Sequence, residues 1–516
     1  MRFRICHRLE VRLLGAVLSG VLLRLSFPDP GWGFLAGIAL VPLFLSLRGK
    51  TWKSRLLLGF VFGAVFFGLL LSWLRFVHPA AVFLACLVLA FYSGLWAVAV
   101  GRLRSVLRMV VWIPVCWTAV EYSRSIGPIG FGWGLLGYTQ WENLPLIQMC
   151  SVLGVYGPSL LIASVNGAVA SLPMALAKRS PRHWLLVAVP FLILAVAWLW
   201  GVSSLRRDFR EERDTVRLGL VQTCFGQQDK WSANRQEDLL AGTFRLTHQA
   251  AQRGVDLVVW PETALPLVLD EFPAVERQLI HTVERLGVPI LAGALVKDSK
   301  AAPESPKTFN AAILYLPGAD PARARPEYDK IHLVPWGEYV PLERFFPFAG
   351  RLVSQEGGGG IDPGDRLTVF RLDGATFSVP ICFESTVPDL VRKFALAGAG
   401  FLVNITNDAW FRKSSAQDLH MIQSVFRAVE NRRWVVRAAN TGRTCVIDPR
   451  GRVVSRLALY APGVLVAEVE PLGITTWYTR LGDWPARLVL GLWIVGLLLP
   501  ACRTVLAGRT GRKTPA

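Results

Sequence analysis

The chain has 516 residues, of which 52% are hydrophobic, and a formal net charge of +19. Its mean hydropathy of +0.39 excludes an ordinary soluble protein and indicates a membrane protein. The apolar residues concentrate in residues 1–203 and 487–516, whereas residues 204–486 carry the charge, Pro and Gly of a globular domain. This middle region is long enough for one large soluble core.

Taken in chain order, eight apolar stretches are candidates for membrane spans, because a hydrocarbon core of about 30 Å needs roughly 20 apolar residues per helix. They lie near residues 11–27, 31–47, 56–76, 79–100, 105–122, 146–175, 184–203 and 487–505. The basic front of the first stretch, MRFRICHR, is also typical of a cleaved signal peptide. Against that alternative, Arg12 and Arg24 interrupt the stretch, and no small-residue cleavage site precedes the next one.

The basic residues predict the orientation of these spans. The N-terminus, the C-terminal tail and the loops 48–55, 101–108 and 178–183 are rich in Lys and Arg, and the loops between them are poor in both. Alternation over eight spans puts both termini in the cytoplasm and the soluble domain outside. The net charge is then explained by attraction to anionic lipid head groups, and no nucleic-acid partner is expected.

Cysteine and histidine spacing argues against a metal centre. Of the eight cysteines, only Cys224, Cys382 and Cys445 fall in the soluble region, where no CxxC pattern occurs. At least one of these three thiols must be free because their number is odd. None of the seven histidines pairs with another at helical spacing, so neither a metal nor a cofactor is expected.

The soluble region alternates predicted strands and helices. Strands are expected at 216–223, 256–263, 288–295, 377–384, 400–408, 434–440, 442–451 and 463–470, and helices at 232–253, 275–287, 387–397 and 417–432. Continuous apolar strands separated by helices predict an α/β domain with buried sheets. In such domains the reactive groups gather where strands end.

Three polar residues occupy such positions. Glu262 follows the apolar run VVWP, Lys330 lies in YDKIHLVPWGEYVP, and Cys382 ends the run SVPIC. A cysteine nucleophile needs a base for its proton and a cation or dipole for the developing negative charge. A shielded carboxylate can be that base, and a lysine that cation. Spacing alone leaves the structural alternatives open: a buried packing cysteine, a solvated glutamate at a turn and a surface lysine.

Several ordered motifs strengthen the catalytic interpretation. VVWPETALP, YDKIHLVPWGEYVPLE, VPICFES and NITNDAWF are similar to the glutamate, lysine and cysteine signatures of the nitrilase (carbon–nitrogen hydrolase) superfamily. HMIQSVFRAVENRRWVVRAANTG continues this pattern, and FGWGLLGYTQ and LIQMCSVLGVYGPSLLIASVN lie in the apolar region before it. With its membrane helices, the chain resembles the bacterial apolipoprotein N-acyltransferase family along almost its full length.

The resemblance implies an α-β-β-α sandwich outside the membrane, carried by about eight transmembrane helices. By it, Cys382 is the nucleophile, Glu262 the general base and Lys330 the residue that stabilises the tetrahedral intermediate. Glu338 and Glu384 match further acidic positions of the family and are expected to position Lys330 and the thiol.

The family pattern also implies substrate-binding positions. Trp231 and Trp410 match aromatic residues around the lipid entrance, and Asn407 and Phe383 lie beside the same motifs. Phe383 stands where tyrosine is common in the family, and Arg412 where glycine is usual. These departures bear on substrate preference or rate more than on reaction type.

The implied reaction is a two-step transfer. The thiol takes an acyl chain from a membrane phospholipid as a thioester, and the α-amine of an S-diacylglyceryl apolipoprotein then accepts it. Hydropathy and loop charges predict about seven transmembrane helices in residues 1–203 and a last helix with a basic cytoplasmic tail in residues 487–516. By the resemblance, the soluble domain at 204–486 is catalytic. We expect a multi-pass monomer of the bacterial inner membrane with its catalytic domain on the periplasmic side.

Alternatives remain open at this point. The same triad would serve a membrane-tethered amidase or nitrilase-type hydrolase, or a paralogous acyltransferase with another acceptor. A transporter is disfavoured because Glu121 is an isolated acidic residue in the spans. The segment 343–360, with three phenylalanines and a four-glycine run, is expected to be a lipid-facing lid or a glycine-rich turn over buried phenylalanines, and 265–273 is a weaker candidate for a lid.

Overall fold

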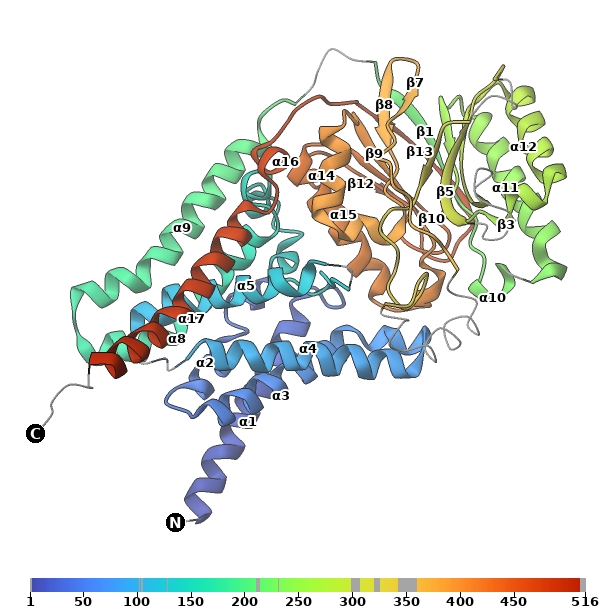
Figure 1. Ribbon diagram of the computed structural model, residues 1–516. Helices are drawn as coiled ribbons and strands as arrows, with labels where there is room; N and C mark the ends of the chain where they lie inside the picture. The colour runs from blue at the N-terminus through green and yellow to red at the C-terminus, as the bar shows by residue number, and fades with distance from the viewer. Residues whose placement is uncertain are drawn as a thin grey trace, which may run out of the picture. The chain divides into compact units, whose positions relative to one another are not determined.

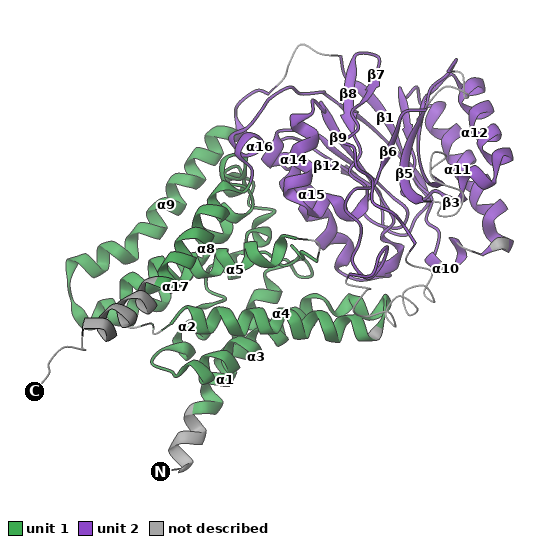
Figure 2. Cartoon of the chain, viewed as in Figure 1, with its two compact units in different colours: residues 1–204, 483–516 green, residues 205–482 purple. Residues whose placement is uncertain are grey.

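The protein is described by a computed structural model that covers residues 2–101, 103, 105–127, 129–209, 214–230, 232–297, 307–319, 325–341 and 360–510 (Figure 1). The chain divides into two compact units (Figure 2). Unit 1 comprises residues 1–204 with 483–516, and unit 2 comprises residues 205–482.

Unit 1 is helical. Its α-helices are α1 (Arg2–Leu25), α2 (Val41–Leu47), α3 (Trp52–Leu70), α4 (Pro79–Ala99), α5 (Ile113–Ser125), α6 (Leu144–Ile147), α7 (Cys150–Leu153), α8 (Tyr156–Lys178), α9 (Pro181–Leu205) and α17 (Trp484–Thr510). Among the described residues, four helices are long and apolar enough to cross a membrane, namely α3, α4, α8 and α9. They correspond to four of the eight predicted spans.

Other predicted spans differ from the observed helices. The stretch 31–47 contains a 3-10 turn at Gly33–Gly37 and then the short helix α2, which has Pro42 in its first turn. The stretch 146–175 is interrupted at Gly154, which ends α7 with a positive φ of 63°. Glycine adopts this conformation without steric cost, so the chain turns before α8 begins. Apolar composition alone does not reveal such breaks.

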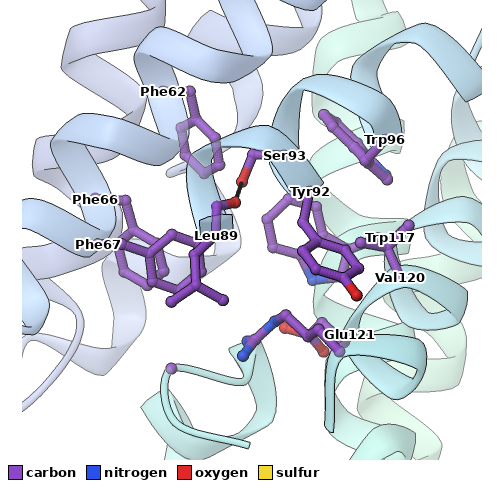
Figure 3. A pocket seen from close by; sticks show the side chains of 12 residues that line it. Phe62, Phe66, Phe67, Leu89, Tyr92, Ser93, Trp96, Trp117, Val120 and Glu121 are labelled. Atoms are coloured by element: carbon purple, nitrogen blue, oxygen red, sulfur yellow. Dashed lines mark hydrogen bonds between the residues drawn. The ribbon is translucent and has the colours of Figure 1, made fainter. Parts of the chain in front are cut away.

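A small cavity in unit 1 lies among aromatic side chains of α3, α4 and α5 and is drawn in Figure 3. Two buried charged residues line it. Glu121 Oε1 accepts a hydrogen bond of 2.7 Å from the Leu136 amide, and Arg124 donates to the carbonyl oxygens of Phe131 and Trp133 at 2.8 and 2.9 Å. Both side chains therefore hold the segment that connects α5 to α6.

The described residues of unit 2 form two sheets. One has seven strands in the order β13-β1-β2-β4-β5-β6, with β3 paired to β4, and the other has six in the order β12-β11-β10-β9-β8-β7. The strands of the first sheet are β1 (Val216–Gln222), β2 (Leu257–Val259), β3 (Leu265–Val268), β4 (Ile290–Lys297), β5 (Thr308–Tyr315), β6 (Glu327–Asp329) and β13 (Gly463–Val469). Those of the second are β7 (Phe370–Leu372), β8 (Ala375–Ser378), β9 (Phe401–Thr406), β10 (Val435–Ala439), β11 (Cys445–Ile447) and β12 (Val453–Arg456).

Helices cover the outer faces of both sheets. The helices of unit 2 are α10 (Gln227–Lys230), α11 (Gln236–Ala251), α12 (Pro273–Leu286), α14 (Pro388–Leu396), α15 (Ala416–Asn431) and α16 (Trp477–Leu481). In Figure 1, α11 and α12 lie outside the first sheet and α14 and α15 outside the second. This is the predicted α-β-β-α sandwich. Its strands consist mostly of buried β-branched and aliphatic residues, and removing these side chains from water stabilises the layered fold.

The sequence predicted most of these elements but misjudged two segments near the site. The strand expected at 377–384 ends at Ser378, because Pro380 has no N–H to continue a ladder, and Cys382 instead begins a 3-10 turn. The segment 265–273 is no lid: it contains strand β3, in which Leu265 and Leu267 are buried. Of the other proposed lid, 343–360, all but Gly360 lies outside the described residues.

Candidate active site

The three predicted catalytic residues lie together in unit 2. Glu262 follows β2, Lys330 directly follows β6, and Cys382 lies four residues after β8. Glu262 and Lys330 are buried, and Cys382 is partly exposed. β2 and β8 each pair in parallel with a neighbouring strand. The site therefore forms where buried strands end, as the sequence pattern predicts.

Glu262 is held by three donors. Its Oε1 accepts hydrogen bonds from Asn310 Nδ2 at 2.8 Å and from Lys330 Nζ at 3.3 Å, and its Oε2 accepts one from the Asn407 amide at 2.8 Å. Burial alone would raise the pKa of Glu262, but Lys330, Asn310 and the Cys382 thiol outweigh it and hold that pKa below its ordinary value. Glu262 is therefore a carboxylate at neutral pH.

Lys330 bridges two carboxylates. Its Nζ lies 2.8 Å from Glu338 Oε1, closer than to Glu262. Glu338 also accepts hydrogen bonds from Asn310 Nδ2 at 3.0 Å and from the Val334 amide at 2.8 Å. Although burial opposes the charged form, Glu338 and then Glu262 raise the pKa of Lys330. The ammonium group is thus a permanent cation beside the thiol.

Cys382 occupies a strained turn. Its φ of 51° lies in the left-handed region that non-glycine residues rarely adopt. Its carbonyl oxygen accepts a hydrogen bond from Ser385 Oγ at 2.9 Å and from Asn404 Nδ2 at 3.3 Å, and His420 Nε2 lies 3.2 Å away. Burial and the nearby Glu262 raise the pKa of the Cys382 thiol, so the thiol is neutral at rest.

A buried polar network supports this turn. His420 Nδ1 lies 2.9 Å from Asp408 Oδ1, and Arg437 donates to Asn404 Oδ1 at 2.5 Å and to Asp408 Oδ2 at 3.4 Å. Burial favours the neutral acid, yet His420 and Arg437 hold the pKa of Asp408 below its usual range. The network connects β9, β10 and α15 to the Cys382 carbonyl and so stabilises the turn.

Glu384 joins the two loops that carry Cys382 and Lys330. Its Oε1 accepts hydrogen bonds from Tyr328 Oη at 2.7 Å and from the amides of Ile331 and His332 at 2.8 and 2.9 Å. Its Oε2 accepts one from the Ile381 amide at 2.7 Å. Burial raises the pKa of Glu384 to about 7 against these bonds. Its position is that of a brace between loops, as expected of a positioning residue.

The residues predicted to bind substrate do not all lie at the grouped glutamate, lysine and cysteine. The Phe383 ring stacks on that of His332, with centroids 5.8 Å apart. Asn407 uses its amide for Glu262 and its Nδ2 for Gln227 Oε1, so its described contacts are to the protein. Trp410 lies in a 3-10 turn after β9 and is partly exposed. Trp231 lies outside the described residues.

Sequence reasoning missed several residues of the site. Asn310, which contacts both Glu262 and Glu338, could have been found as a polar residue inside the apolar strand TFNAAILY. His420 and Asp408 carried no comparable signal, because their contacts join distant parts of the chain. Among the described residues, no group of three or more His, Cys, Asp or Glu side chains could hold a metal ion.

Comparisons with known proteins agree with this architecture. Residues 217–479 match the carbon-nitrogen hydrolase family, which is the class that the sandwich and the grouped glutamate, lysine and cysteine define. Residues 19–168 match the apolipoprotein N-acyltransferase N-terminal domain.

Relatives narrow the class to one family. The chain is 37% identical over 486 residues to "Apolipoprotein N-acyltransferase" of Geobacter metallireducens, with 91% of each chain covered. It is 33% identical over 525 residues to "Apolipoprotein N-acyltransferase 1" of Treponema pallidum, with 93% of this chain and 94% of the relative covered. The chain belongs to the apolipoprotein N-acyltransferase family and is therefore an acyltransferase.

The catalytic domain is also distantly similar to a solved structure. Saccharomyces cerevisiae Nit3, a member of branch 10 of the nitrilase superfamily, is 20% identical with a TM-score of 0.38, and covers 50% of this chain and 90% of its own. That similarity is too weak to say anything about the site.

Proposed function

We propose that this enzyme transfers an acyl chain from a membrane phospholipid to the N-terminal α-amine of S-diacylglyceryl apolipoproteins, through a thioester on Cys382. The observation that carries the proposal is the convergence of Glu262, Lys330 and Cys382 in one domain. In the described part of the same chain, four helices are long and apolar enough to cross a membrane. A reactive thiol on such a chain stays near the acyl esters of the bilayer.

In the first step, Cys382 Sγ attacks the ester carbonyl while the Glu262 carboxylate takes the thiol proton. Proton transfer must accompany attack because the thiol is neutral and the carboxylate ionised at rest. Lys330 stabilises the tetrahedral oxyanion through its charge. When the intermediate collapses, the C–O bond breaks, the C–S bond remains, and Glu262 returns the proton to the departing lysophospholipid alkoxide.

In the second step, the α-amine of the apolipoprotein attacks the thioester carbonyl. Glu262 accepts a proton from the attacking amine, and Lys330 again stabilises the oxyanion. Collapse forms the amide and breaks the C–S bond, and the leaving sulfur of Cys382 regains its proton from Glu262. The enzyme returns to its starting state, so the two substrates use one site in turn.

The remaining site residues support this chemistry without reacting. Glu338 holds Lys330 and Asn310 holds Glu262 by hydrogen bonds, and Glu384 braces the loop that carries the thiol. We assign Trp231 and Trp410 to the lipid entrance, and Phe383 and Asn407 to the surroundings of the bound substrate, as the family resemblance implies.

The proposal includes a location. Residues 1–203 and 487–516 are assigned to a multi-pass membrane region of about eight spans, and residues 204–486 to a catalytic domain on the periplasmic side of the inner membrane. Loop charges support this orientation, because the Lys-rich and Arg-rich loops alternate with neutral ones. We propose that the enzyme acts as a monomer.

The acceptor step has a direct test. Purified protein in phospholipid micelles is given a peptide with an N-terminal S-diacylglyceryl cysteine, and the product is sequenced by mass spectrometry. We expect one added acyl chain on the α-amine, stable to hydroxylamine, and none when that amine is acetylated. Release of free fatty acid without peptide acylation would instead identify a hydrolase that uses water as the acceptor.

A further inference from the structure

A second buried lysine contacts the base of the proposed reaction. Lys230, the last residue of α10, is only 4% exposed. Its Nζ donates a hydrogen bond of 2.9 Å to the carbonyl oxygen of Glu262 and one of 2.5 Å to Thr263 Oγ1. Lys230 therefore contacts the backbone of the residue that takes the proton in the proposed reaction.

The turn that Lys230 contacts is strained. Thr263 has a φ of 44°, which is unfavourable for a β-branched residue. Space behind the turn is also tight: a Cβ on Gly293 would lie 2.5 Å from the Pro261 carbonyl oxygen and 2.8 Å from the Thr263 nitrogen. Such a conformation persists only when its surroundings hold it in place, and Lys230 supplies two of the hydrogen bonds that do so.

The same short helix reaches the other end of Glu262. Gln227 Oε1 accepts a hydrogen bond of 2.8 Å from Asn407 Nδ2, and the Asn407 amide donates to Glu262 Oε2 at 2.8 Å. One turn of helix, α10, thus contacts the Glu262 backbone directly and its carboxylate through Asn407.

We propose that Lys230 is a positioning residue for acyl transfer: it clamps the strained Glu262–Thr263 turn and so aims the Glu262 carboxylate at the Cys382 thiol. This inference deepens the proposed function and rests on Glu262 acting as the base. Lys230 itself exchanges no proton with substrate.

The charge of Lys230 gives the clamp a pH dependence. The titratable groups that face it are Glu262 and Cys382, and the Glu262 carboxylate in turn pairs with Lys330. Burial lowers the pKa of Lys230 to about 8, against the opposing effect of Glu262. The pKa of Lys330 is raised, so Lys330 stays charged in this range. Glu384, with a pKa of about 7, affects only the more acidic side.

The test compares rates of acyl-enzyme formation in phospholipid micelles without acceptor. We expect Lys230→Met to be roughly 10- to 100-fold slower, since small misplacements of a catalytic group have effects of this size. Glycine adopts a positive φ without strain, so a turn with glycine at position 263 no longer needs the clamp. The double variant Lys230→Met/Thr263→Gly should therefore form the acyl-enzyme nearly as fast as Thr263→Gly alone. The matched control Lys393→Met, on the surface of α14, should keep the wild-type rate.

A pH profile separates clamping from general stability. The wild-type rate should fall as the pH rises through about 8, where Lys230 loses its charge, and the fall should be absent in Lys230→Met. A variant that merely folds less well would keep the alkaline fall. An unchanged rate in Lys230→Met, or a double variant as slow as Lys230→Met, would overturn the inference.

The role of Lys230 can also be tested if the proposed acyl transfer is wrong. If the wild type takes up no acyl chain, phospholipid is not the donor, and Lys230 is then tested by alkylation of Cys382 with iodoacetamide, followed by peptide mass. We expect slower alkylation in Lys230→Met than in wild type, because the displaced carboxylate no longer assists the thiol. Equal alkylation rates would overturn the inference without any acyl substrate.

Discussion

Glu338→Gln is the change that tests the electrostatics of the site most sharply. Glu338 Oε1 lies 2.8 Å from Lys330 Nζ and 3.0 Å from Asn310 Nδ2, and its Oε2 accepts the Val334 amide at 2.8 Å. A glutamine keeps the shape of the side chain but loses its charge. Its NH₂ group replaces one of the two carboxylate oxygens and therefore faces a hydrogen-bond donor. All the groups that Glu338 contacts are donors, so one of them loses its partner.

The expected size follows from these contacts. A hydrogen bond to a charged group contributes about 1.5–3 kcal/mol, and at 25 °C that corresponds to a roughly 10- to 100-fold change in an equilibrium. With Glu338 neutral, Lys330 is drawn toward Glu262, which lies 3.3 Å away. The base then holds a tighter ion pair and is less free to take the thiol proton. We therefore expect acyl-enzyme formation to slow roughly 10- to 100-fold.

The assay is single-turnover acylation of the purified variant, followed by intact mass. Glu327→Gln is the matched control, because Glu327 also pairs with a cation, Arg325, at 3.1 Å, but both side chains are about a quarter exposed. Solvent screening limits such pairs to about 1 kcal/mol or less. A Glu338→Gln variant that folds normally and acylates at the wild-type rate would refute the assignment of Glu338 to holding Lys330.

Two further changes test the supports of the site. Glu384→Ala leaves four donors, two of them buried, without their acceptor. Unfolding should therefore become easier by about 3 kcal/mol, and the melting temperature should drop by several degrees. Glu468→Ala, on the exposed face of β13, should leave the melting temperature unchanged, and equal melting temperatures for the two variants would contradict the bracing role. Gly293→Ala puts a Cβ 2.5 Å from the Pro261 carbonyl oxygen and 2.9 Å from Glu262 Cα, so acylation of the enzyme should slow about 10-fold or more. The control Gly463→Ala, whose Cβ would meet nothing nearer than 3.7 Å, should not slow acylation. Equal acylation rates for the two variants would argue against a rigid Glu262 turn.

The triad could be placed from sequence because each member follows a buried strand. Glu262 follows VVWP and Cys382 follows SVPI, and apolar runs of that kind end at a common edge in an α/β domain. Lys330 was harder, because β6 has only three residues and no periodicity to recognise. For all three residues the pattern left structural alternatives open, and the motif resemblance carried the prediction.

The supporting residues could not be predicted, for physical reasons. Lys230 is a charged residue in a polar segment, and this pattern predicts an exposed side chain. In the structure the side chain is buried against Glu262 and Thr263. Only the packing of α10 onto that turn makes its role visible. The broken helices of unit 1 were missed in the same way, because a positive φ at Gly154 depends on tertiary context and leaves the hydropathy unchanged.

The thioester on Cys382 is tested by the intact mass of the protein after incubation with phospholipid and no acceptor, beside Cys382→Ala. We expect a mass gain of one acyl chain, labile to hydroxylamine and absent from the variant. The gain should map to the peptide that contains Cys382. No gain in protein that is folded and bound to lipid, or an equal gain in Cys382→Ala, would contradict the thioester and with it the assignment of Cys382 as the nucleophile.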